Sequence, residues 1–313
     1  MIKYLAKRLA RSVITLIIII SIVFILLRLM PIEGYFQNFD KLTKEQIHTG
    51  IVNMGLDKPI FLQLKNFFLQ LLHGDLGVSR IYRANVPITK ILAGKVPISL
   101  TLGGISLILS LGFGIPLGTL MARSKGRFWD KFGTAFIVFI QAVPAAVYYL
   151  FIQVFGHQYF GFSILFDKDN AATWILPVIS LSLGNIAYYS MWLRRYMVDE
   201  SNKDYVKLAI AKGVSSKDIM MKHVFRNAFV PMIQYLPSSF LNTIVGSIYV
   251  ESLYSVPGMG GLLVDVVKRQ DNTMVQAIVV LFACVGILGL ILGDILMTII
   301  DPRISFNKKG GAR

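Results

Sequence analysis

Long apolar runs constrain this 313-residue chain more than any other feature. The hydrocarbon core of a bilayer is about 30 Å thick, so a helix that crosses it needs about 20 consecutive apolar residues. Runs of that kind are Val13–Met30, Ser99–Ala122, Phe132–Phe155, Trp174–Leu193 and Ala277–Ile300. A further run, Phe229–Val250, is more polar, which favours a position facing the bundle interior or a water-filled path. We therefore predict an all-α integral membrane protein with six transmembrane helices.

The first run differs from a secretory signal peptide. It follows a basic start, Met1–Arg11, but it is too long and lacks a small-residue cleavage site. It therefore predicts the first transmembrane helix, with Arg28 near its far end able to snorkel to the interface. The region after it, 31–96, is more polar. Within that region Phe61–Leu72 has helical periodicity and predicts an amphipathic helix ended by Gly74 and Gly77.

Lysine and arginine set the orientation of the predicted spans. The chain has 32 Lys and Arg against 17 Asp and Glu, a net charge of +15. Most of the basic residues lie in segments 1–11, 123–131, 194–227 and 303–313, whereas the two short loops on the other side hold only Lys168, Lys268 and Arg269. Because short cytoplasmic loops are enriched in Lys and Arg, both termini are predicted to be cytoplasmic. The positive charge then reflects membrane topology and not binding to nucleic acid.

The sequence contains none of the common catalytic motifs. It has no G-x-x-x-x-G-K-[ST] phosphate loop, and no H-E-x-x-H, G-x-S-x-G or Cys-x-x-Cys motif. Its single cysteine, Cys284, excludes an intrachain disulfide. Asp294 in the last run is either a proton or cation site or an interhelical hydrogen-bonding group, and the second is favoured because one carboxylate makes a poor relay. Prolines inside the runs predict kinked helices: Pro116, Pro144, Pro177 and Pro237. Kinked, partly polar helices without a catalytic set indicate part of a transporter.

The segment between the fourth and fifth predicted spans, 204–231, is basic and amphipathic. Gly213 can end a first short helix by taking a positive φ, and Ser215 can cap a second one with Asp218 three residues on. The second helix is predicted to run to Pro231, where the missing N–H favours a kink or a new beginning. Two interpretations are open at this point. The segment is either a loop lying on the membrane surface or a docking element for another protein.

The same segment resembles the cytoplasmic coupling loop of ABC transporter permeases of the binding-protein-dependent dipeptide, oligopeptide and nickel branch. The resemblance covers nearly the whole chain. Other matching stretches are Gly55–Pro59, Gly74–Gly77 with Ser79, Val96–Pro97 with Leu100, Trp174–Pro177, Glu251, Pro257–Gly258 with Gly260, and Asp301–Arg303. The resemblance implies a type I ABC importer permease fold in the cell membrane. The implied division is 1–97 for the first helix and extracytoplasmic region, 98–303 for the permease domain with a coupling loop at 204–228, and 304–313 for a cytoplasmic tail.

The resemblance also implies partners and site residues. The partners are a second homologous permease, two ATPase subunits that hold ATP and magnesium, and an extracytoplasmic solute-binding protein, while this chain binds no cofactor or metal. The residues assigned to ATPase coupling are Tyr205, Lys207, Ala209, Ala211, Gly213, Ser215, His223, Arg226 and Asn227. Small Ala209 and Gly213 are expected to approach a groove on the ATPase. Lys207 stands where the wider superfamily has a glutamate. Candidate residues facing the path are Gln234, Ser238, Asn242 and Glu251.

Several functions remain open on the sequence alone. The branch most often imports di- and oligopeptides, and nickel, glutathione or oligosaccharide are alternatives on the same architecture. An ion-coupled secondary carrier would need a set of membrane carboxylates and an internal repeat, neither of which is visible. An integral-membrane enzyme would need a nucleophile and base within the spans, and none stands out. The expectation is therefore a transport subunit without its own ATPase site.

Overall fold

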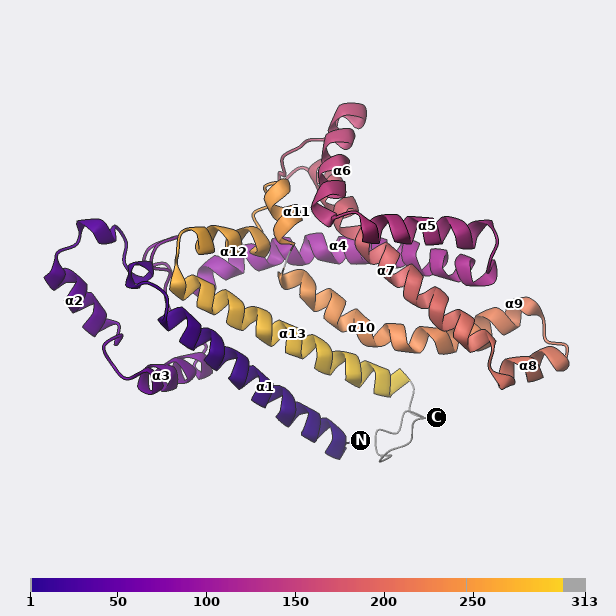
Figure 1. The fold of residues 1–313 in the computed structure, drawn as a ribbon, viewed down its shortest axis with the longest axis horizontal. Coiled ribbons are helices and arrows are strands. Elements are labelled where there is room, and N and C mark those ends of the chain that lie inside the picture. The colour runs from indigo at the N-terminus through magenta and orange to yellow at the C-terminus, as the bar shows by residue number, and fades with distance from the viewer. Residues whose placement is uncertain (1, 246, 301–313) are drawn as a thin grey trace.

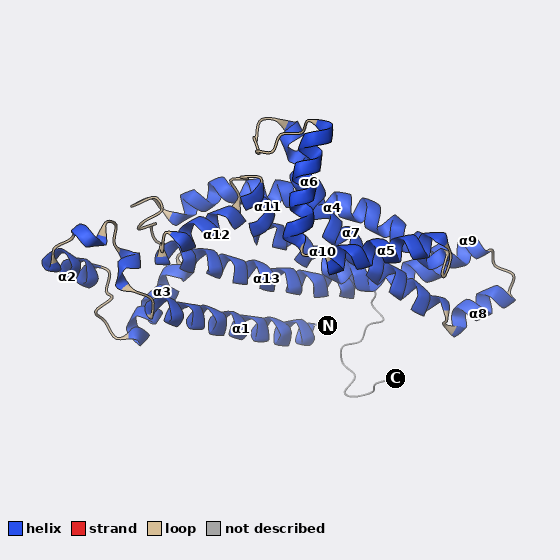
Figure 2. Cartoon of the chain, turned by 45° about the horizontal axis from the view of Figure 1, so that its top comes forward, coloured by secondary structure: helices blue, strands red, loops and turns tan. Residues whose placement is uncertain are grey.

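The computed structural model describes residues 2–245 and 247–300, and in that part of the chain the regular structure is helical (Figures 1 and 2). The long helices lie roughly side by side. The start of α1 (Ile2–Arg28) and the end of α13 (Asn272–Ile300) lie toward one end of the molecule. That end also holds the segment around α8 and α9. The opposite end holds α2 (Lys44–Asn53), α3 (Ile60–Leu72) and α12 (Met259–Lys268).

Four described helices are long and apolar enough to cross a membrane, and a bent pair makes a possible fifth span. The four are α1, α4 (Ile88–Arg123), α7 (Ile175–Ser201) and α13. The bent pair is α5 (Phe128–Ala142) and α6 (Ala145–Phe160). The more polar α10 (Arg226–Val245) is not among them. The chain is thus an all-helical membrane protein.

The predicted run Phe132–Phe155 is not one straight helix. Its two halves, α5 and α6, meet at 106°. The break falls at Val143 and Pro144. A residue before proline is disfavoured in the helical conformation, and Val143 is extended; Pro144 itself has no N–H to continue the helix. The kink expected at Pro144 is therefore confirmed. The prediction that 132–155 forms one continuous transmembrane helix is wrong, because the run is two helices.

Two other predicted boundaries also shift. The second long helix, α4, begins at Ile88, well before Ser99, and continues through Pro97. The run expected to end at Val250 stops as a helix at Val245. A separate short helix, α11 (Ile248–Leu253), then begins with Ser247 as its N-cap. The predicted amphipathic helix is confirmed as α3, which ends before Gly74 at φ +72°.

A stripe of small residues brings α4 and α7 together in the most extensive helix contact of the fold. The stripe recurs every fourth residue of α4, which puts its members on one face, and all are buried: Ser106, Ser110, Gly114 and Gly118. Ser110 Oγ donates to the Ser182 carbonyl at 3.2 Å, and Ser182 Oγ donates to the Ser106 carbonyl at 3.2 Å. A Cβ at Gly118 would lie 2.7 Å from the Ser190 carbonyl oxygen. Small side chains therefore allow these two backbones to approach closely within the bilayer.

The second close contact joins α10 to α13. A Cβ on Gly289 would lie 2.8 Å from the Ser238 Cα, and one on Gly293 would overlap the carbonyl oxygen of Gln234. Gln234 Nε2 also donates to Asp294 Oδ1 at 3.0 Å across the same contact. The interhelical hydrogen bond expected of Asp294 is thus confirmed.

Substituting Gly293 by valine is expected to lower the free energy of unfolding by about 2–3 kcal/mol, because the new side chain must displace the backbone of α10. Gly286→Val is the matched control on the same helix, since a Cβ there meets no atom within 4 Å. Thermal unfolding of the purified full chain in detergent measures both. Equal midpoints for the two variants would contradict this packing.

A buried carboxylate connects the N-terminal region to α13. Asp271 Oδ2 accepts hydrogen bonds from the Ser79 hydroxyl at 2.7 Å and from the backbone N–H groups of Arg80, Ile81 and Tyr82 at 2.9–3.1 Å. Its Oδ1 accepts from the Met274 N–H at 3.1 Å in the first turn of α13. These contacts, called the Asp271 junction below, join segments separated by about 190 residues. The stretch 79–82 is thereby held against the end of the bundle.

Candidate coupling site and solute path

The two-helix corner predicted between the fourth and fifth spans is present. The first helix, α8 (Asp204–Ala211), ends with Gly213 at φ +72°, and the Val214 N–H bonds back to the Ala209 carbonyl at 3.1 Å. That is the bonding pattern of a Schellman cap. The second helix, α9 (Ser216–Asp218), begins with Ser215 as its cap, which accepts from the Asp218 N–H at 3.1 Å. The corner is therefore set by local chemistry.

The continuation of the second helix differs from the prediction. A π-helical stretch, Ile219–Phe225, leads directly into α10, which runs through Pro231 and Pro237. The helix does not end or restart at Pro231. The change of helix type instead falls between Phe225 and Arg226, and such π-helical turns are frequent at functional sites.

The coupling corner (204–227) has a buried apolar face and also carries exposed apolar side chains. Val206 is 3% exposed and Ala209 is 8% exposed, and both pack against α7 and α10 in a cluster that includes Leu193, Met197 and Val224. The methyl group of Ala209 is largely covered by its own chain, and its expected approach to an ATPase groove stays a prediction. Leu208 and Ile210 are 56% and 61% exposed, and Ala211 and Gly213 are also exposed.

The Tyr205 hydroxyl joins the corner to both adjacent long helices. It donates to Glu200 Oε1 of α7 at 2.9 Å and accepts from Asn227 Nδ2 of α10 at 2.9 Å. The His223 carbonyl lies 3.3 Å from the same oxygen. Burial raises the pKa of Tyr205, so the hydroxyl keeps its proton at neutral pH. Among the residues predicted for coupling, Tyr205, His223 and Asn227 are thus brought together.

Lys207 has a local partner in the structure. Its ammonium lies 2.9 Å from Asp204 Oδ1, one turn earlier on α8, and this hydrogen bond lowers the pKa of Asp204. Lys222 pairs with Asp218 in the same way at 2.8 Å and lowers the pKa of that carboxyl. Exposed pairs of this kind contribute little to stability. Lys212, Lys217 and Arg226 are exposed as well, so the corner presents a basic surface.

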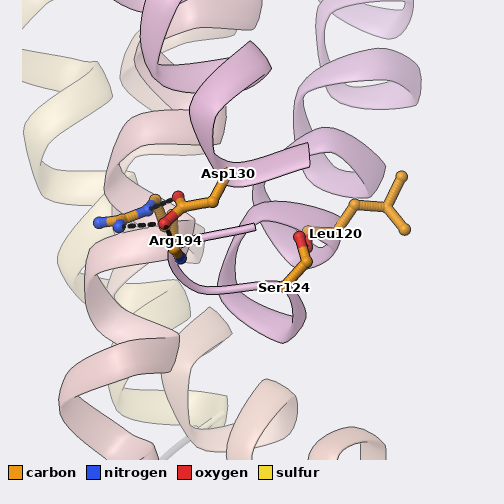
Figure 3. Close-up of polar contacts among 5 residues, drawn as sticks. Leu120, Ser124, Asp130 and Arg194 are labelled. Carbon is orange, nitrogen blue, oxygen red and sulfur yellow. Dashed lines mark hydrogen bonds and ion pairs between the residues drawn. The ribbon is translucent and has the colours of Figure 1, made fainter. Parts of the chain in front are cut away.

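An ion pair joins α5 to α7. Arg194 Nη2 donates to Asp130 Oδ2 at 2.8 Å and its Nε donates to Oδ1, so the pair is bidentate (Figure 3). The same carboxylate accepts from the Gly126 N–H at 2.8 Å, where Gly126 has φ +76°. The turn after α4 is therefore held on α7, close to Glu200. In the sequence Arg194 belongs to a basic segment, and its position directly after an apolar run is the one signal of such an ion pair.

A polar cavity of about 220 Å³ lies between α4, α7, α10 and α11. Among its lining residues are Asn242, Glu251, Ser239 and Ser106. Two of the four predicted path residues thus share this cavity, whereas Gln234 and Ser238 lie on the α13 side of α10. Tyr189 of α7 donates to the Ser239 hydroxyl at 2.7 Å. This bond ties α7 to α10 beside the cavity.

Glu251 holds the far side of this cavity in place. Its carboxylate accepts from Ser99 Oγ at 2.8 Å and from the N–H groups of Gly260 and Gly261 at 2.7 and 3.0 Å. These N–H groups belong to the first turn of α12, where a carboxylate is favourable. Gly258 is the N-cap of α12, so the stretch that follows Pro257 begins a helix.

The described residues contain no group of three or more His, Cys, Asp or Glu arranged to hold a metal ion. The coupling corner is held by helix caps and by the hydrogen bonds of Tyr205 to α7 and α10. The cavity is polar and bordered by two helices that the corner directly contacts.

Comparisons with known proteins agree with this geometry. Residues 114–306 match the family described as "Binding-protein-dependent transport system inner membrane component", and residues 1–102 match the N-terminal family of such components. The dipeptide transport system permease protein DppB of Lactococcus lactis is 32% identical over 97% of this chain and 99% of its own length. The oligopeptide transport system permease protein AmiC of Streptococcus pneumoniae is 38% identical over 67% of this chain, which spans 42% of that relative.

A solved structure has the same fold. It is titled "Crystal structure of an amino acid ABC transporter with histidines" and superposes with a TM-score of 0.53 at 16% identity. The match covers 69% of this chain and 95% of that one. Proteins of the matched family are membrane permease components that lack ATPase activity, bind no cofactor themselves, and work with ATPase and binding-protein partners. The chain therefore belongs to the family of binding-protein-dependent transport system inner membrane components, as a multi-pass permease of an ABC importer.

Proposed function

We propose that this chain imports di- or oligopeptides as one of two homologous permease subunits, driven by two ATPase subunits. The observation that carries the proposal is the structure of the coupling corner. One face of α8 packs against its own chain, and the exposed side chains of the corner are apolar or basic. The peptide substrate is supported by the names of the similar DppB and AmiC proteins. A binding protein outside the membrane would deliver the peptide.

The proposed topology has six spans with both termini in the cytoplasm. It counts α10 as a sixth span, which is more polar than the others and borders the polar cavity. It is supported by the bundle itself, since the start of α1, the turn after α4, the coupling corner and the end of α13 gather toward one end (Figure 1). The proposed division into 1–97 and 98–303 has its boundary inside α4, which begins at Ile88, and residues 301–303 lie outside the described part of the chain. The tail predicted at 304–313 lies outside the described residues.

In the proposed mechanism, closure of the two ATPase domains pushes on the coupling corner. Force passes through Tyr205 to α7 and α10, because its hydroxyl bonds to a side chain on each helix. The same two helices are joined again beside the cavity by Tyr189 and Ser239. Tilting them together would change the access of the cavity from outside to inside. Nucleotide would thus bias a two-state equilibrium by binding one state better than the other.

Replacing Tyr205 by phenylalanine tests this route. The ring remains, but the hydroxyl that bonds Glu200 and Asn227 is lost, so the peptide taken up per ATP hydrolysed is expected to fall about three- to tenfold. The measurement compares peptide uptake with phosphate release in proteoliposomes that contain the complete transporter. Tyr159→Phe on the exposed face of α6 is the control.

An unchanged ratio of uptake to hydrolysis in the Tyr205 variant would contradict transmission through this hydroxyl. Peptide uptake by this chain in vesicles without ATPase subunits would contradict the proposed function as a whole. That result would favour the ion-coupled carrier.

A further inference from the structure

A second cavity, of about 330 Å³, lies where α1 leaves the bundle and is unrelated to the polar cavity beside α10. Its walls come from the end of α1, the segment 52–58, α3, the segment 76–80 and the start of α13. In Figure 1 α3 lies beside the far end of α1. Phe24 and Phe67 pack across that contact with ring centroids 5.2 Å apart. The cavity is therefore at the level where a membrane-spanning helix ends.

The charged side chains that line this cavity are all positive. Arg28, Lys58 and Arg80 are lining residues, and no Asp or Glu is among the described residues that line it. The remaining polar side chains are neutral: Asn53, Gln63, Asn66, Gln70, Thr273 and Gln276. Three cations around one polar cavity favour an anionic ligand.

Arg28 does not extend away from the protein as snorkelling would require. Its guanidinium lies over the rings of Phe24 at 4.7 Å and Tyr35 at 5.1 Å. Its Nε is buried and has no hydrogen-bond partner among the described residues. A buried donor of this kind is costly unless a ligand accepts from it.

Gln63 adds a requirement for a hydrogen-bond donor on the ligand. Its Nε2 donates to the carbonyl oxygens of Leu56 at 3.0 Å and Lys58 at 2.7 Å, which fixes the orientation of the amide. Its Oε1 is buried and has no partner among the described residues. A matching ligand therefore carries an acid group together with a hydroxyl or amine.

The two helices that wall this cavity, α1 and α3, also carry exposed apolar side chains. Leu26 and Leu29 at the end of α1, with Phe61 and Leu72 on α3, are exposed. Exposed apolar side chains on the helices that wall a cationic cavity match a molecule with acyl chains and an anionic head. Arg28 ends a membrane span whichever way the chain is oriented, so this location does not depend on the proposed function.

We propose that the cavity binds the headgroup of an anionic phospholipid whose phosphate diester carries free hydroxyls, as in phosphatidylglycerol. The phosphate would accept from Arg28 and Arg80, with Lys58 at the mouth, and a headgroup hydroxyl would donate to Gln63 Oε1. The lipid would hold α1 and α3 together at the membrane surface.

Native mass spectrometry of the purified full chain tests this proposal, with phosphatidylglycerol or phosphatidylcholine added at equal concentration. Wild type is expected to retain phosphatidylglycerol preferentially, and retention is expected to fall about fivefold for each of Arg28→Gln and Arg80→Gln. Arg83→Gln is the matched control, since Arg83 is exposed on the same loop and is absent from the lining. Lys58→Gln is the second variant, because its exposed side chain can be changed without disturbing the fold.

Equal retention of the two lipids by wild type would overturn the proposal, as would retention by the Arg80 and Lys58 variants equal to that of the Arg83 control. Soluble glycerol phosphate supplies a separate arm. If it displaces the lipid at millimolar concentration, the site takes a free phosphate ester and the lipid assignment is overturned. If it does not, the acyl chains are part of recognition, as proposed.

Discussion

Replacing Asp271 by alanine is expected to lower the free energy of unfolding by about 3–5 kcal/mol, the largest effect of any single substitution considered for this chain. The carboxylate is fully buried and accepts five hydrogen bonds, one from a hydroxyl and four from backbone N–H groups. Alanine would leave these donors buried without an acceptor. Ser79 and the backbone at 80–82 cannot turn toward water without leaving the end of α13. The expected result is a chain that inserts into the membrane but aggregates after extraction.

Size-exclusion chromatography after a series of heating steps measures this loss as a lower aggregation midpoint. Asp271→Asn should be milder, because the amide oxygen can still accept from some of the donors although its NH₂ group opposes the others. Asp40→Ala is the control, since Asp40 is exposed in the same N-terminal region. If Asp271→Ala and Asp40→Ala had the same midpoint, the Asp271 junction would have no stabilising role.

The coupling corner could be predicted because its cause is local. Gly213 has a positive φ and Ser215 caps the next helix, and both follow from residues within one helical turn. The break at Pro144 was predictable for the same reason. The angle of 106° was not, because it depends on how α5 and α6 pack against the rest of the bundle.

The parts that could not be predicted depend on tertiary contacts. The Asp271 junction joins residues about 190 positions apart, and no periodicity in the sequence relates them. The buried position of Ala209 depends on which face of α8 meets α7 and α10. The small-residue stripe of α4 is different, since its four-residue spacing is visible in the sequence. It could have predicted a close helix contact but not its partner.

We infer that the exposed apolar residues of α8, Leu208 and Ile210, are candidates for contact with the ATPase beside Ala209. Leu208 and Ile210 are exposed on different sides of a short helix, and the exposed Lys207 and Lys212 lie on the same segment. An apolar centre with a charged rim is the usual anatomy of a protein interface. An acidic rim on the ATPase would complement Lys212 and Lys217, and the apolar pair would supply most of the affinity.

Leu208→Asp is therefore expected to weaken ATPase binding about 30-fold, because a charge would enter the apolar centre of the contact without a partner. The tagged chain should insert normally but recover little ATPase in co-purification, and peptide uptake should fall in proportion. Leu165→Asp is the matched control, since Leu165 is 62% exposed, close to the 56% of Leu208, but lies in the loop between α6 and α7. Leu208→Met should retain binding because it keeps the apolar volume. Normal ATPase recovery with Leu208→Asp would mean that α8 contacts lipid instead, which is the alternative that the sequence left open.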